Sequence, residues 1–114
     1  MSWRRRSMIE VVRGEVLRLC ALRGGRGREQ RDARYAVVVQ ADELDLSTIL
    51  IAPTSTRALP TTFRPAIALE GTQTRVLIEQ MTAVHPGRLG RSIGRLDASE
   101  LRAVDEALAL VLGL

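Results

Sequence analysis

A cation and a group of hydroxyls stand at the ends of two apolar runs in this 114-residue sequence. Arg34 directly precedes the run 35–39, and the hydroxyl cluster Thr54-Ser55-Thr56 follows the run 48–52 after Pro53. If the two runs pair as antiparallel strands, the head of one lies beside the tail of the other. A guanidinium with neighbouring hydroxyls suits the oxygens of a phosphate group. The pattern therefore predicts that Arg34 and these hydroxyls meet at a site for a phosphodiester.

Each of these residues also has a purely structural interpretation. Arg34 can begin a strand and pair with Asp32 or Glu29, and the hydroxyls can be turn residues at a strand end. Glu79 can form an ion pair with Arg75 or Arg95 on a sheet face, or accept a hydrogen bond from an exposed base edge. Glu29 and Gln30 lie in a glycine- and arginine-rich loop. They can contact a ligand there, or they can simply be solvated.

The composition excludes several classes of site. All 17 basic residues are Arg and the net charge is +4, which favours an acidic partner and bidentate phosphate contacts. The single cysteine, Cys20, excludes an internal disulfide and a cysteine-rich zinc site, and it fits a reducing, cytoplasmic compartment. No cofactor or metal site is expected. Charged residues interrupt every apolar run well short of membrane-spanning length, so no membrane association is expected.

The remaining patterns predict short strands and one helix. Strands are expected over 11–19, 34–40, 47–52, 63–69, 75–84 and 92–96, with 21–33 as a loop and Pro65 at a sheet edge. Asp97 and Glu100 form a capping-box pattern, Leu101, Val104, Leu108 and Val111 recur at helical spacing, and Gly113 stops the helix. The fold class is mainly β with α: a small, bent antiparallel barrel closed by a C-terminal helix. Residues 1–10 are expected to be a flexible basic arm, and 11–114 a single domain.

Several segments, in order, resemble the MazF/PemK/Kid family of toxins. The similar segments are Arg13-Gly14-Glu15-Val16, Gly27-Arg28-Glu29-Gln30, Arg34 with Val37-Val38-Val39-Gln40, Pro53-Thr54-Ser55-Thr56, Glu79-Gln80, and 96–108. The resemblance covers roughly residues 12–114. The sequence departs from the family pattern in four places. Tyr35 replaces a proline, Leu17 replaces a common aromatic residue, and Leu77 stands where some members carry a basic residue. The loop before Glu29 is also longer by a few residues.

The resemblance implies an SH3-like, Kid-type barrel, a homodimer and a metal-independent endoribonuclease. Such an enzyme cleaves single-stranded RNA to 2′,3′-cyclic phosphate and 5′-hydroxyl ends. The implied catalytic residues are Arg34 and Ser55, with Thr54 and Thr56 as alternative hydroxyls. The implied RNA contacts are Glu29, Gln30, Thr54, Thr56, Arg57, Glu79 and Gln80. A MazE-like antitoxin whose tail occludes the RNA groove is also implied, with DNA contacted only through that antitoxin.

Two other functions remain open from the sequence. A protein of the same fold can be a non-enzymatic toxin that binds DNA gyrase and inhibits it by protein contact. Alternatively, because Tyr35 and Leu77 depart from the family pattern, the protein can be a catalytically inactive module that binds RNA or an antitoxin.

Overall fold

The computed structural model describes residues 10–20 and 34–114. The expectations for the basic arm through residue 9 and for the loop 21–33, with Glu29 and Gln30, lie outside the described residues. The described residues form β1 (Glu15–Leu19), β2 (Tyr35–Val38), β3 (Ile49–Ser55), β4 (Ala66–Leu69), β5 (Thr72–Val76), η3 (Ile78–Gln80), β6 (Thr82–Val84), η4 (Pro86–Arg88), β7 (Leu89–Arg95) and α1 (Ala98–Leu112). The two η elements are single 3₁₀ turns.

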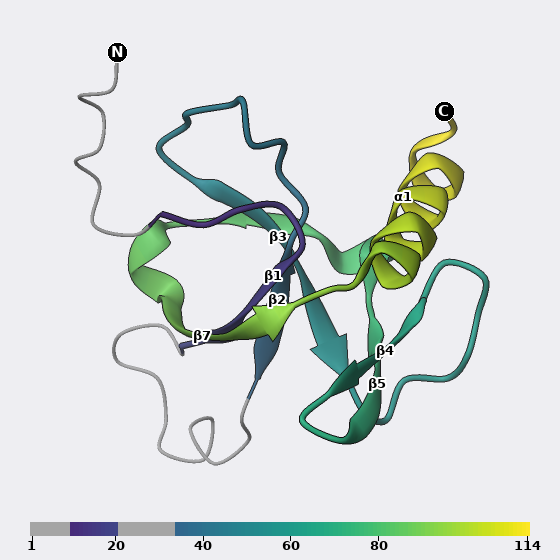
Figure 1. The fold of residues 1–114 in the computed structure, drawn as a ribbon. Helices are drawn as coiled ribbons and strands as arrows, with labels where there is room; N and C mark the ends of the chain where they lie inside the picture. Colours follow the sequence, from purple (N-terminus) through teal and green to yellow (C-terminus); the bar gives the residue numbers. More distant parts are fainter. Residues whose placement is uncertain (1–9, 21–33) are drawn as a thin grey trace.

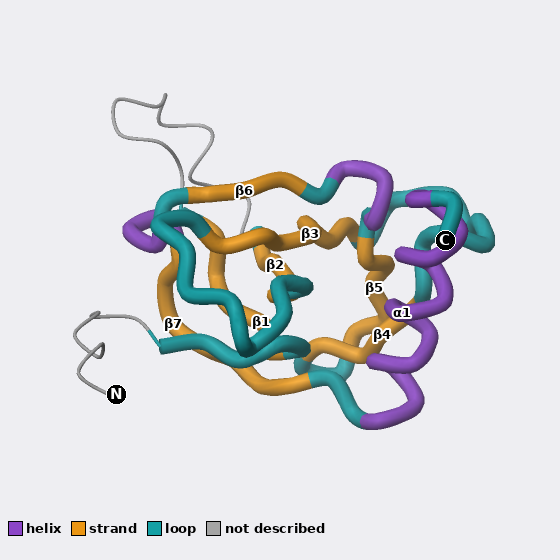
Figure 2. Tube along the Cα trace, turned by 90° about the horizontal axis from the view of Figure 1, so that it is seen from above, coloured by secondary structure: helices purple, strands orange, loops and turns teal. Residues whose placement is uncertain are grey.

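The strands form one antiparallel sheet in the order β4-β5-β3-β2-β1-β7, with β6 also paired to β3. The sheet curls into a half-barrel, and α1 lies along one side of it (Figures 1 and 2). The predicted fold class, mainly β with a C-terminal helix, is confirmed. β4 lies at one end of the strand order and directly follows Pro65, so the predicted edge position is also confirmed.

The middle strands carry continuous apolar runs because both of their faces are buried. On one face, Val37 and Ala52 pack with Val104 and Ala107 of α1. On the other face, Ala36, Val38 and Ile51 pack with Leu17 and Leu89. The predicted pairing of the two runs is confirmed, since β2 and β3 match Ala36 to Pro53, Val37 to Ala52 and Val38 to Ile51.

The predicted capping box of α1 is present in both directions. Asp97 Oδ1 accepts a hydrogen bond from the Glu100 N–H at 2.7 Å, and Glu100 Oε1 accepts one from the Asp97 N–H at 3.0 Å. Gly113 ends the helix at φ 73°. Val111, the last residue of the predicted apolar pattern, is 37% exposed. The buried positions of the helix, Val104 and Ala107, lie more than a turn earlier, and the last turn carries several exposed leucines.

The expected strand 75–84 is wrong, because the chain breaks into β5, η3 and β6. Val76 pairs with Thr54, so an unbroken strand would bring Glu79 opposite Ile51. Instead Thr82 lies there. The register is therefore shifted by three residues, and the 3₁₀ turn η3 takes up the extra length. Glu79 lies on this turn and not on a sheet face.

Other strand boundaries also differ from the expected ones. β1 begins at Glu15 and not at residue 11, because Gly14 makes a turn at φ 88° just before it. β3 continues past Pro53 to Ser55, where it pairs with β5. The hydroxyls of Thr54 and Ser55 therefore belong to a strand and not to the turn after it.

Candidate active site

Arg34 and Ser55 stand on facing strands at the same end of the sheet. The β2–β3 register matches Ala36 to Pro53, and two further steps bring Arg34 opposite Ser55. The Thr54 hydroxyl donates a hydrogen bond to the Tyr35 carbonyl at 3.1 Å, which shows that the two strands stay close beyond the Ala36–Pro53 pair. Both residues line one open groove with a volume of about 710 Å³.

The groove lies where β3 leaves β2 and turns toward the β4–β5 hairpin. Among the described residues, half of its lining carries a hydroxyl, and the rest comprises two guanidiniums, one carboxylate, one amide and two leucines. The lining residues are Arg34, Tyr35, Thr54, Ser55, Thr56, Arg57, Leu69, Glu70, Thr72, Thr74, Leu77 and Gln80. Of the site residues predicted from the sequence and described here, only Glu79 is missing from the lining.

The three candidate hydroxyls differ in their hydrogen bonds. Thr54 uses its proton for the Tyr35 carbonyl, so that proton holds β2 and β3 together. The Ser55 oxygen accepts the Arg57 N–H at 3.1 Å, which leaves the Ser55 proton free to point at a ligand. Thr56 is exposed, and its side chain makes no hydrogen bond within residues 10–20 and 34–114. Ser55 is therefore the strand residue best prepared to donate into the groove.

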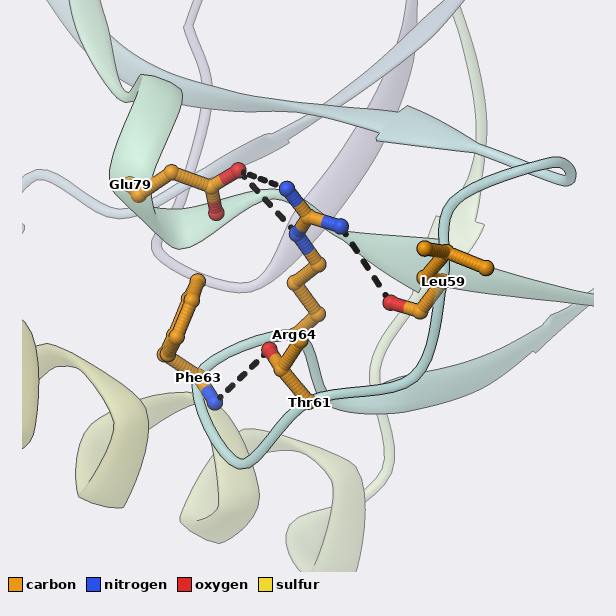
Figure 3. A network of polar contacts seen from close by, with 5 residues as sticks. All are labelled: Leu59, Thr61, Phe63, Arg64 and Glu79. Atoms are coloured by element: carbon orange, nitrogen blue, oxygen red, sulfur yellow. Dashed lines mark hydrogen bonds and ion pairs between the residues drawn. The ribbon is translucent and has the colours of Figure 1, made fainter.

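Glu79 is bound to Arg64, a partner that the sequence did not suggest. Arg64 donates from Nη2 and Nε to Glu79 Oε2 at 2.7 and 3.0 Å (Figure 3). The hydrogen bond from Arg64 holds the pKa of Glu79 below the ordinary glutamate value. Of the two alternatives for Glu79, the ion pair with Arg75 or Arg95 is not formed, since the carboxylate pairs with Arg64. Because β5 ends at Val76, Glu79 turns toward the loop 56–65.

The same arginine fixes the loop 56–65, which connects β3 to β4. Arg64 Nη1 donates to the Leu59 carbonyl at 3.2 Å, and Arg75 Nη1 donates to the Arg64 carbonyl at 2.9 Å. Arg75 is itself the partner of Ser55 in the β3–β5 ladder. The Glu79–Arg64 pair thus anchors the loop that begins with Thr56 and Arg57 at the groove.

Sequence reasoning missed the wall of the groove that the β4–β5 hairpin supplies. Glu70, Thr72 and Thr74 come from this hairpin, and Thr74 is 3% exposed. The only local signal was the turn sequence Glu70-Gly71. Which strand the hairpin joins depends on long-range pairing with β3, and no local pattern carries that information.

His85, the one histidine in the sequence, does not line the groove. Its Nδ1 accepts the Gly87 N–H at 2.9 Å within the turn that begins η4. Among the described residues, no three carboxylate, imidazole or thiol side chains come together as metal ligands would. In the same part of the chain, no helix has the length and hydropathy needed to cross a membrane.

Fold and site together define a half-barrel protein with an arginine- and hydroxyl-lined groove, and residues 13–112 match the family of PemK-like, MazF-like toxins of type II toxin–antitoxin systems. The chain belongs to this family, and it is the toxin of a toxin–antitoxin system.

Individual relatives agree with that assignment. The chain is 38% identical over 105 residues to the Mycobacterium tuberculosis H37Rv protein named "Putative toxin Rv3098A", covering 91% of this chain and 99% of that one. Its fold is similar to that of a mycobacterial endoribonuclease solved with its cognate antitoxin, with a TM-score of 0.74, 20% identity, and 91% and 96% coverage of the two chains. MazF from Deinococcus radiodurans gives a TM-score of 0.73 at 20% identity, with 93% and 99% coverage.

Proposed function

We propose that this toxin is an endoribonuclease that cleaves single-stranded RNA without a metal ion, leaving 2′,3′-cyclic phosphate and 5′-hydroxyl ends. The observation that carries the proposal is the cross-strand position of Arg34 and Ser55 in one open groove. Family membership supports it, as do the similar mycobacterial proteins named endoribonucleases.

RNA brings its own nucleophile to this reaction. The 2′-oxygen forms a bond to the neighbouring phosphorus, the bond from phosphorus to the 5′-oxygen breaks, and one proton passes from the 2′-hydroxyl to the leaving oxygen. Negative charge grows on the non-bridging oxygens, where a fixed guanidinium stabilises it. Arg34 is assigned this role, because a guanidinium carries a positive charge, only donates hydrogen bonds and is a poor base. Ser55 is assigned as the hydrogen-bond donor to the same phosphate.

The remaining groove residues have supporting roles in the proposal. Arg57 contacts a second phosphate, and Thr56 and Gln80 hydrogen-bond to the RNA. Thr54 acts indirectly by joining the two strands that carry Arg34 and Ser55. Glu79 acts through Arg64 and the loop 56–65, since its carboxylate is already paired. Glu29 and Gln30 remain proposed RNA contacts.

The deciding experiment is cleavage of a long single-stranded transcript in the presence of EDTA. The wild-type protein is expected to leave cyclic-phosphate ends. Arg34→Ala should lower the cleavage rate by about 10²–10³-fold, as loss of one oxyanion donor does in other enzymes. Arg102→Ala, an exposed arginine on α1, is the matched control and should cleave normally. Full activity of Arg34→Ala in a folded protein would refute the site assignment.

Two partners complete the proposal. The toxin forms a homodimer, and a cognate MazE-like antitoxin places its tail in the RNA groove, so that DNA is contacted only through the antitoxin. Structures of similar proteins with cognate antitoxins support this. Co-expression with a small acidic-tailed protein from the adjacent reading frame should abolish cleavage. Undiminished cleavage in the complex would contradict an occluding tail.

A further inference from the structure

The strained residue of the groove is Glu70, in the tight turn between β4 and β5. Leu69 pairs with Thr72, so the turn has only two residues, Glu70 and Gly71. Their φ angles are 49° and 83°, both in the left-handed region. Two-residue turns of this kind favour Asn-Gly, Asp-Gly or Gly-Gly, because longer side chains are disfavoured at positive φ. Non-glycine residues held in this conformation cluster at active sites and ligand contacts.

The chemistry of the groove makes a glutamate at this place unusual. Glu70 lines the same groove as Arg34 and Arg57, and among the described lining residues it is the one acid. Within the described chain its carboxylate has no hydrogen bond or ion pair. A carboxylate only accepts hydrogen bonds and repels phosphate. It is therefore suited to a donor group of the ligand and not to the phosphate backbone.

The position of Glu70 separates it from the reacting phosphate. Ser55 pairs with Arg75, and β5 runs from there back to Thr72 beyond the end of β3. At about 3.3 Å per residue, the start of β5 is about 10 Å along the strand from Arg75, the cross-strand partner of Ser55. The turn lies beyond that point, out of hydrogen-bond reach of the bond that breaks. A neighbouring nucleotide of the bound strand is the group that can reach it.

We infer that Glu70 selects a guanine in the RNA strand next to the cleaved bond, an inference that rests on the proposed nuclease function. Single-stranded RNA is recognised through the exposed edges of its bases. Guanine alone presents two adjacent donors, N1–H and the N2 amino group, which match the two oxygens of a carboxylate. Cytosine and adenine place an acceptor beside their amino group, and uracil flanks its N3–H with two carbonyls.

The test compares the cleavage-site profiles of four proteins on one long transcript, with the ends mapped by sequencing. The wild-type protein should show guanine enriched at one fixed position near the cut. Glu70→Gln, which keeps the shape and removes the charge, should lower that enrichment roughly tenfold, the scale of one bidentate base contact. Glu106→Gln, the same change on the exposed face of α1, should keep the wild-type profile.

A fourth protein separates function from the local fold. Glu70→Asn suits the turn better, so its melting temperature should equal or exceed that of the wild type while the guanine preference is lost. A profile of Glu70→Gln that superimposes on the wild-type profile overturns the inference and leaves the nuclease proposal intact. If Glu70→Gln lowers the cleavage rate equally at all sites of the transcript, the inference is also overturned, since Glu70 would then act in the chemical step. Absence of any cleavage by the wild type overturns both proposals.

Discussion

At the scale of single residues, the candidate site depends on which hydroxyl protons are already used. Thr54 donates to the Tyr35 carbonyl, whereas Ser55 accepts from the Arg57 N–H and keeps its own proton. Neighbouring residues of the same chemical type therefore have different roles. The distinction follows from the backbone group nearest to each hydroxyl, which is the Tyr35 carbonyl for Thr54 and the Arg57 N–H for Ser55.

The hydroxyl series gives the first residue-scale prediction. Ser55→Ala should lower the cleavage rate by about 10²-fold, since it removes one donor to the phosphate. Thr56→Ala should change the rate much less, because Thr56 follows the strand and has no fixed hydrogen-bond geometry. The measurement is single-turnover cleavage of a short RNA by each variant. If Thr56→Ala is the inactive variant, Ser55 is the wrong assignment.

Substitution of Thr54 is expected to change the stability of the fold and not the cleavage rate. Thr54→Val keeps the shape but loses the hydrogen bond to Tyr35 O, which should lower the free energy of unfolding by about 0.5–1.5 kcal/mol. Thermal unfolding of Thr54→Val beside Thr56→Val, the matched exposed change, measures this difference.

At the scale of elements, η3 and the loop 56–65 form the support of the groove. The three-residue register shift along β3 creates η3, and η3 presents Glu79 to Arg64. That ion pair and the bonds from Arg64 to Leu59 and from Arg75 to Arg64 hold the loop (Figure 3). The side chains of Arg64 and Glu79 are only 22% and 27% exposed, so the pair is partly shielded from water.

The Glu79–Arg64 pair predicts a pH-dependent contribution to stability. Because Arg64 lowers the pKa of Glu79 in the folded protein, the contribution is present above the unfolded pKa of about 4.3 and is lost as the pH falls through the folded pKa. Glu79→Gln should therefore be less stable than the wild type by about 0.5–1 kcal/mol at pH 7. Thermal unfolding should show this gap closing in acid.

The matched control for that experiment is Glu106→Gln, an exposed change on α1. Its difference from the wild type should be small and should not follow the same pH course. A gap for Glu79→Gln that stays constant from neutral to acidic pH would show that the ion pair does not stabilise the fold.

At the scale of the whole molecule, the end of α1 carries apolar surface that the half-barrel does not cover. Leu110, Leu112 and Leu114 are 57%, 54% and 91% exposed on the last turn and the terminus. Contiguous exposed apolar surface marks association sites. The proposed homodimer would bury them.

The dimer proposal predicts a change in assembly from a double substitution. Leu110→Glu with Leu112→Glu places two charges on this surface and should shift the protein toward monomer in sedimentation velocity at a fixed concentration. Leu59→Glu, an exposed leucine in the loop 56–65, is the control and should sediment as the wild type does. A wild-type protein that sediments as a monomer at all concentrations would refute the homodimer.

Local patterns in the sequence were sufficient for the helix and for the pairing of β2 with β3. The capping residues Asp97 and Glu100 and the stop at Gly113 act through neighbours a few residues away. The two aliphatic runs are recognised by their own composition and follow one another in the chain, so these features need no coordinates. The same locality explains why Arg34 and Ser55 were predicted to meet. They flank paired runs, and antiparallel pairing brings those ends together.

Only the tertiary structure decided the break between β5 and β6, the partner of Glu79 and the place of Glu70. An alternating sequence such as 75–84 fits a continuous strand, but β3 offers pairing positions that are offset by three residues. Arg64 and Glu79 are fifteen positions apart and meet because the loop and η3 fold onto the same side. Glu70 enters the groove because β5 joins the end of β3. These outcomes depend on long-range register, which residue type and local spacing do not encode.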